Sequence, residues 1–249
     1  SDSEILYASA SPIVIHDLNS NYQVFFDGHK DDITCFNVSD DGLLCASGEV
    51  GKAPCLLIWE TALADDITTI GPDQPSNAPY VRGLVARLGK GFFSRGICAT
   101  AFSCDKKYVA AVSCDDNHCM GVWSVATGEL LANMVTGSGV PPQIRTLAWS
   151  PGSYQDTGFI NKDHEEVPCD ILVTGGEHNY LRFWSFKRPN KQGIGAQLSD
   201  RGHRTGKELA SPPKSHNCSL FVPREDCDDP VALQYDVLTA GDNGCVYLW

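Results

Sequence analysis

The sequence lacks any apolar run of about 18 residues, the length that a membrane-spanning helix needs, and it lacks the basic-then-apolar segment of a secretory leader. No stretch has convincing helical periodicity either. Positive charge is scarce, because 19 Lys and Arg residues stand against 31 Asp and Glu, for a net charge of −12. These absences argue against a membrane span, a secreted protein and nucleic acid as the main partner, since phosphate binding needs clustered Lys and Arg.

Cysteine is plentiful, but it shows no disulfide pattern. The chain has 11 cysteines, an odd number at irregular spacing. Cys35, Cys98 and Cys169 lie on or beside apolar segments, where a free thiol acts as a small buried hydrophobic side chain. We therefore expect reduced cysteines and a cytoplasmic protein.

A short apolar segment that ends in Trp recurs every 61 to 65 residues. Each copy follows a turn of small and polar residues, and three of those turns follow an alternating segment that closes on Ser, at 33–39, 97–103 and 144–150. Alternation of period two places side chains on both faces of a strand. A single sheet of such strands cannot bury both faces, so sheets must stack around an axis with Trp packed between them. The recurring residues are Trp59, Trp123, Trp184 and Trp249.

This pattern predicts an all-β protein, a WD40-type β-propeller of about four and a half four-stranded blades. Asp242, Asn243 and Gly244 join the two apolar runs of the last hairpin and supply the positive φ that a tight turn needs. His16 stands where the other copies have Trp. The whole chain, 1–249, is read as one propeller segment with blades at 4–27 (partial), 28–71, 89–136, 143–186 and 216–249 (partial).

The Trp spacing exceeds the roughly 40 residues of an ordinary WD40 blade. Composition assigns the excess to three long loop insertions, which are rich in Pro, Gly and polar residues. The first separates an expected outer strand at 66–71 from the next blade. Function often lies on surface loops of this kind. The predicted insertions are residues 72–88, 151–170 and 187–217.

One ordered set of segments begins with Gly28 and His29 and comprises 28–35, 46–52, 58–60, 91–97, 101–103, 115–118, 173–178 and 239–244. Together these segments resemble the EML proteins, the echinoderm microtubule-associated protein-like family. The resemblance covers roughly residues 20–249 and follows one order along the chain. It implies a larger tandem propeller, microtubule association and no cofactor. The coiled coil and the hydrophobic HELP motif that precede these blades in the family do not appear here, so the chain is interpreted as part of a longer protein.

Charge is distributed unevenly along the chain. The segment 187–217 holds seven basic and two acidic residues, a net charge of +5, which leaves −17 for the remainder. A basic loop on an acidic body could bind an acidic surface such as that of tubulin, with a salt-sensitive association rate. Alternatively, the segment is a solvated loop whose charge only prevents aggregation. The candidate binding residues are Lys187, Arg188, Lys191, Arg201, Arg204, Lys207 and Lys214.

No residue pattern indicates catalysis or a metal or cofactor site. Cys114, His118 and Cys119 lie close together, but no second Cys/His pair stands at zinc-finger spacing. The glycines from Gly89 to Gly96 lack the Gly-Lys-Ser/Thr ending and the helix of a phosphate-binding loop. We expect Phe92, Phe93 and Arg95 to be structural, and Asp32, Asp116 and His29 to satisfy backbone groups at turns.

Two functional hypotheses follow. The first is a non-catalytic, microtubule-associated propeller that binds tubulin and resides with the cytoskeleton in the cytoplasm, as the EML resemblance implies. The second is a protein-interaction scaffold of the same architecture with a different protein partner, because a propeller offers broad rigid faces without obligatory chemistry.

Overall fold

The computed structural model describes residues 3–61, 83–136, 143–160, 166–206, 211–223 and 235–249. Within these ranges it contains 18 strands and no α-helix, so no helix there could span a membrane. The strands form five antiparallel sheets in which each strand pairs with the next one along the chain. The predicted all-β propeller fold is therefore confirmed.

Two of the sheets have three strands, and three have four. The first and fifth sheets comprise β1 (Glu4–Ala8), β2 (Ile13–Asp17) and β3 (Tyr22–Phe26), and β16 (His216–Pro223), β17 (Tyr235–Gly241) and β18 (Val246–Leu248). The second and third comprise β4 (Ile33–Val38), β5 (Leu44–Glu49), β6 (Leu56–Glu60) and β7 (Leu84–Leu88), and β8 (Ile97–Phe102), β9 (Tyr108–Ser113), β10 (Cys119–Ser124) and β11 (Leu130–Val135). The fourth comprises β12 (Ile144–Ile160), β13 (Glu166–Gly176), β14 (Tyr180–Lys187) and β15 (Gln197–Thr205).

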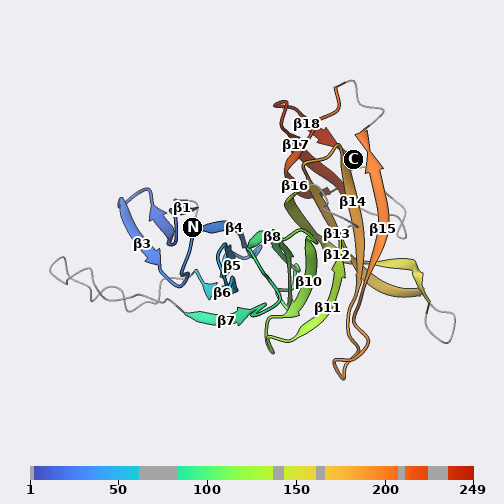
Figure 1. Ribbon diagram of the computed structural model, residues 1–249, viewed down its shortest axis with the longest axis horizontal. Coiled ribbons are helices and arrows are strands. Elements are labelled where there is room, and N and C mark those ends of the chain that lie inside the picture. The colour runs from blue at the N-terminus through green and yellow to red at the C-terminus, as the bar shows by residue number, and fades with distance from the viewer. Residues whose placement is uncertain (1–2, 62–82, 137–142, 161–165, 207–210, 224–234) are drawn as a thin grey trace.

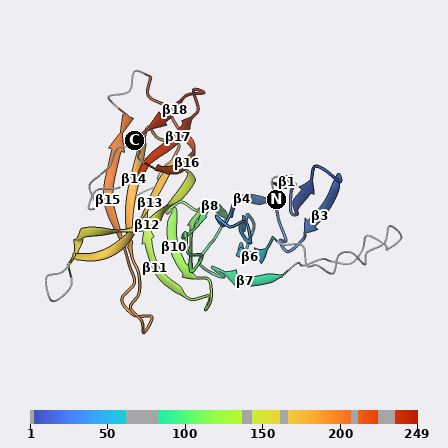
Figure 2. The same cartoon turned by 180° about the vertical axis from the view of Figure 1, so that it is seen from behind.

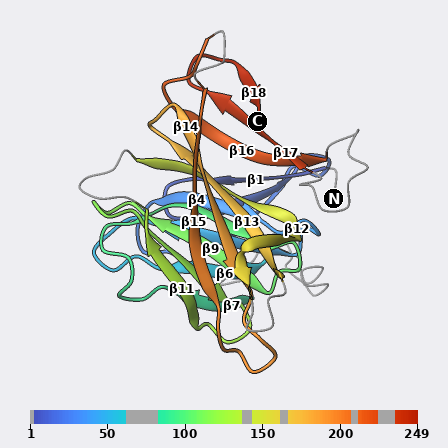
Figure 3. The same ribbon diagram turned by 90° about the vertical axis from the view of Figure 1, so that its right-hand side faces the viewer.

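The sheets follow one another in chain order along an arc (Figure 1). The first sheet and the fifth lie at opposite ends of this arc, as the view from behind also shows (Figure 2). From the side, the fifth sheet lies above the first three sheets and beside the upper part of the fourth, against which it packs (Figure 3). The first strands of the second, third and fourth sheets, β4, β8 and β12, pack beside one another on the inner side of the arc.

Aromatic side chains fill the spaces between neighbouring sheets. Trp59 is fully buried and stacks on Phe26 of the first sheet, with ring centroids 4.3 Å apart. Trp123 lies between the second and third sheets, and its ring centroid is 5.1 Å from that of Phe92 and 5.5 Å from that of Phe93. Trp184 is fully buried in the cluster that joins the third and fourth sheets, and Trp249 is partly buried against the cluster between the fourth and fifth.

A buried polar network fixes the first of these tryptophans. Ser47 Oγ accepts a hydrogen bond from Trp59 Nε1 at 3.0 Å and lies 2.6 Å from Nε2 of His29. The carboxylate of Glu49 is 3.3 Å from Nδ1 of the same histidine and accepts the backbone N–H groups of Lys30 and Cys55. The same pattern recurs in the fifth sheet through His216, Thr239 and Trp249. These histidines therefore hold strands together from within the core.

The serines that close the alternating segments organise the turns after β4 and β8. Ser39 Oγ donates to Asp41 Oδ1 at 2.7 Å, and Ser103 Oγ donates to Asp105 Oδ1 at 2.8 Å. Each serine oxygen also accepts the backbone N–H at the start of the following strand. The repeated Ser therefore marks a turn built from side-chain to backbone hydrogen bonds.

All three predicted loop insertions contain strands, so reading them as loops was wrong. Residues 72–88 include β7, the fourth strand of the second sheet, while the strand expected at 66–71 lies outside the described residues. Residues 151–170 extend β12 and β13, which pair from Ile144 and Gly176 out to Ile160 and Glu166. Residues 187–217 include β15, so the fourth sheet continues beyond the expected end at residue 186. Of these strands, β15 is a polar outer strand that pairs on one side only, so a reading based on apolar alternation missed it.

Candidate protein-binding surfaces

The predicted basic loop is in large part the outer strand of the fourth sheet. β15 pairs with β14 from Gln197 opposite Lys187 to Thr205 opposite Tyr180. The register shifts between Arg182 and Trp184, so that Arg201 and Gly202 together face a single residue of β14. This is a β-bulge, and Gly202 takes the positive φ of 85° within it. A bulge turns side chains away from the regular pleat, and here it turns Arg201 toward solvent.

Arg201 and Arg204 are both exposed on this strand, and we call them the basic edge. Arg201 Nε donates a 2.7 Å hydrogen bond to Ser185 Oγ, and the Arg204 guanidinium lies 5.6 Å from the ring centroid of Phe183. Ser185 and Phe183 are two residues apart on β14 and so point to the same face. Both guanidinium groups are therefore anchored over the face that the fourth sheet turns toward the fifth.

Arg188 does not belong to this surface, although the sequence grouped it there. It is partly buried between the third and fourth sheets, 2.6 Å from a carboxylate oxygen of Asp105 and 3.0 Å from one of Asp170. It also lies 5.3 Å from the ring centroid of Tyr108. Burial alone would lower the pKa of the guanidinium, but hydrogen bonds to the two carboxylates raise its pKa above the usual value. Arg188 clamps two sheets together.

The other predicted basic residues are dispersed. Lys187 ends β14 at the far end of β15 from Arg204, and Lys191 is exposed in the turn between those strands. Lys214 is exposed beside the fifth sheet, where its backbone N–H donates to Asp242 Oδ1 at 2.9 Å. Lys207 lies outside the described residues. The seven residues therefore do not form one surface. Only Arg201 and Arg204 are held close together, because both lie on β15.

Arg182 was missed by the sequence reasoning. From the opposite face of β14 it pairs with Asp200 and donates to the backbone oxygen of Thr136, while its guanidinium lies 4.7 Å from the ring centroid of Trp184. The hydrogen bond from Arg182 lowers the pKa of the Asp200 carboxyl. The one acidic side chain described on β15 is thus neutralised from within the sheet, which leaves the outer side of the strand positive.

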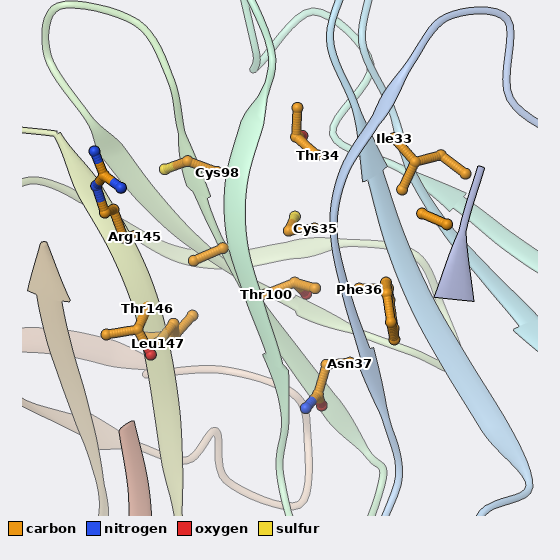
Figure 4. Close-up of a pocket in the computed structure, with 12 residues that line it drawn as sticks. Ile33, Thr34, Cys35, Phe36, Asn37, Cys98, Thr100, Arg145, Thr146 and Leu147 are labelled. Carbon is orange, nitrogen blue, oxygen red and sulfur yellow. The ribbon is translucent and has the colours of Figure 1, made fainter. Parts of the chain in front are cut away.

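A second candidate surface, which is concave, lies on the inner side of the arc. The inner strands β4, β8 and β12 line a groove of about 310 Å³ (Figure 4). Among the described residues of its wall, Arg145 is the only charged one, and it forms a 2.6 Å ion pair with Glu177. Polar side chains between apolar ones suit the edge of an extended peptide, which brings its own hydrogen-bonding groups. Those that Figure 4 labels include Thr34, Asn37, Thr100 and Thr146.

The described residues contain no group of three or more His, Cys, Asp or Glu that could hold a metal ion. His118 lies in the turn between β9 and β10, where its Nδ1 is 3.0 Å from the backbone oxygen of Ser113. Arg95 forms an exposed ion pair with Asp116 at 2.7 Å. Each of these polar side chains therefore has a local structural role.

Comparison with known proteins places these surfaces in context. The model of the WD domain, G-beta repeat, matches residues 20–60. The chain is 26% identical to the Ciliary WD repeat-containing protein ctxp80 of Euplotoides octocarinatus over 98% of its own length and 29% of that protein. It is 27% identical to Echinoderm microtubule-associated protein-like 1 of Rattus norvegicus over 77% of its length and 20% of that protein. The chain therefore spans less than a third of either relative.

A solved structure supports the fold independently of sequence. KlHsv2 with loop 6CD replaced by a Gly-Ser linker aligns with 82% of this chain and 57% of its own, at a TM-score of 0.53 and 14% identity. That likeness concerns the fold alone. Together, the five stacked sheets, the matched WD repeat and the similarity over most of the chain identify an EML-like WD40 propeller.

Proposed function

We propose that this EML-like WD40 chain is a non-catalytic, cytoplasmic scaffold that associates with microtubules by binding an acidic surface of tubulin at its basic edge. The observation that carries the proposal is the exposure of Arg201 and Arg204 on a bulged outer strand of a chain whose net charge is −12. The printed names of two relatives, one ciliary and one microtubule-associated, agree with this direction.

The geometry favours a specific contact over a diffuse charge effect. Arg201 is held by Ser185, and the guanidinium of Arg204 lies over an aromatic ring, so both side chains lose less conformational freedom on binding than solvated arginines would. Guanidinium groups also bind carboxylates in a bidentate manner. An acidic partner would meet a locally positive strand even though the whole molecule repels it.

The direct test is co-sedimentation of the chain with microtubules, comparing the wild type with the double variant R201E/R204E. We expect the variant to bind about tenfold more weakly, which corresponds to about 1.4 kcal/mol, a modest loss for two exposed charge contacts that become repulsive. The matched control is K52E/K90E, which makes the same change in net charge at two exposed lysines on loops of the second and third sheets.

Equal weakening by both double variants would show that only total charge matters and would overturn the assignment of the basic edge. Unchanged binding by R201E/R204E would do the same. Absence of binding by the folded wild type would favour the second candidate, a scaffold for another protein partner. The inner groove of about 310 Å³ is the surface that favours this alternative, because it can receive an extended segment.

A further inference from the structure

Two cysteines of the third sheet meet at a break in its regular pairing. Ile97 pairs with Ser113, but the next pair is Ala99 with Val112, so Cys98 is an extra residue in β8. Cys114 follows β9 directly, and its backbone N–H donates to the oxygen of Gly96 at 2.8 Å. The bulge thus places Cys98 across from the residues that lead into Cys114.

The two side chains share one face of the sheet. Cys98 belongs to the buried cluster between the third and fourth sheets, and Cys114 packs against the same cluster. Sγ of Cys98 lies 3.4 Å from the backbone oxygen of Val112 and 3.5 Å from that of Ser113. The Cys98 sulfur therefore lies beside the backbone that leads directly into Cys114, on the face of the sheet where Cys114 also packs.

Their surroundings give the two thiols different reactivities. The neighbouring Cys98 thiol lowers the pKa of Cys114, because it stabilises the thiolate, whereas Cys114 and burial raise the pKa of Cys98. Cys114 is partly exposed, and Cys98 is buried beside the inner groove (Figure 4). Cys35, the third thiol nearby, is inert by comparison, since burial raises its pKa to about 12.

We propose that Cys114 and Cys98 are an oxidisable pair that forms a reversible disulfide with hydrogen peroxide as the oxidant. The site is distinct from the basic edge and does not depend on the proposed function.

The chemistry balances with one molecule of peroxide. The Cys114 thiolate attacks a peroxide oxygen, the O–O bond breaks, and the departing hydroxide takes up a proton, which leaves a sulfenic acid and water. The Cys98 sulfur then attacks the Cys114 sulfur as its own proton is lost, the S–O bond breaks, and a second water leaves. The two sulfurs lose two electrons, which the peroxide gains.

Peptide mapping of the whole chain tests the proposal. After treatment with peroxide and blocking of free thiols with N-ethylmaleimide, we expect a Cys98–Cys114 linked peptide that disappears on reduction with dithiothreitol. In C98A, Cys114 should persist as a sulfenic acid that dimedone traps. In C114A, Cys98 should remain a thiol. C104A, which removes an exposed cysteine of the same sheet region, should retain the linkage.

Oxidation confined to the exposed Cys104, Cys218 and Cys245 in the wild type would overturn the proposal, since it would show that exposure alone decides reactivity. Loss of the Cys98–Cys114 peptide in C104A would overturn it as well, because it would assign Cys104 as a partner. Mapping of the wild type decides the matter even if a variant fails to fold.

Discussion

Ser47 shows how a small side chain can hold a large one in place. Its hydroxyl is fully buried between the ring nitrogens of His29 and Trp59, and the histidine in turn approaches the buried carboxylate of Glu49. Burying these polar groups costs free energy unless each finds a partner. The network therefore fixes the orientation of the tryptophan that joins the first two sheets.

Ser47→Ala should destabilise the chain by roughly 2–4 kcal/mol, because Nε2 of His29 and Nε1 of Trp59 both lose their hydrogen bond to the serine hydroxyl. Urea unfolding followed by tryptophan fluorescence measures this as a lower midpoint with an unchanged slope. Ser20→Ala, at an exposed turn, is the matched control and should change the midpoint little. Equal midpoints for both variants would refute a structural role for the network.

Acid should weaken the fold through its buried histidines. Burial, followed by the neighbouring His178, lowers the pKa of His216 to about 4, and burial also lowers the pKa values of His29 and His178. An unfolded histidine takes up a proton near pH 6.5, so the unfolded state binds more protons between about pH 6.5 and 4. The stability is fully present above this window and falls as the pH drops through it.

For His216 alone, we expect a loss on the order of 2 kcal/mol across the window, after allowance for access by water. Urea midpoints measured from pH 7 to 4 should therefore decline, and His216→Gln should flatten the decline. His203→Gln, at an exposed position, should leave it as steep as in the wild type. A pH-independent midpoint would contradict the assignment of neutral buried imidazoles.

At the scale of elements, the outer strands differ most from the sequence predictions. The inner strands were recognisable because alternating apolar residues pack against neighbouring sheets. β15 buries little besides Leu198 and carries Asp200, Arg201, His203 and Arg204, so its sequence has the composition of a loop. Backbone pairing with β14 makes it a strand nonetheless, and charged side chains on an outer edge also discourage pairing with other molecules.

The Arg188 clamp is the element-scale feature that a mutation tests best. Arg188→Met keeps the aliphatic stem but removes one partner of the carboxylate of Asp170, which is buried. The expected loss is about 2–4 kcal/mol in the free energy of unfolding, because removing one partner leaves a buried charge less compensated. Urea unfolding measures it. Lys187→Met, the neighbouring basic residue, is the control and should have a much smaller effect; equal losses would contradict the clamp.

For the whole molecule, repetition made the fold predictable from the sequence. Four Trp segments and three alternating segments that close on Ser predict the sheets and their order without any long-range information. The candidate site was less predictable, because its partners come from different strands. The ion pair of Arg182 with Asp200 depends on a register shift in β14 and β15, and the burial of Arg188 depends on carboxylates from two sheets. Sequence reasoning could count the charges but could not locate their partners.

The charge of the molecule likewise depends on which basic residues have partners and which stay exposed. The segment 187–217 has an excess of basic residues, but Arg188 is committed to the core and Arg182 neutralises Asp200. What remains exposed is a small positive surface on an acidic body. A contact of this kind should be strong at low ionic strength and weak at high, since salt screens exposed charges beyond about 8–10 Å.

The salt dependence of microtubule binding by the wild type and by R201E/R204E decides whether the basic edge contacts tubulin. We expect wild-type affinity to fall steeply with rising salt and the double variant to bind weakly with a flatter dependence, so that the two curves converge at high salt. Parallel curves, with the wild type and the variant losing affinity at the same rate, would contradict a tubulin contact at the basic edge.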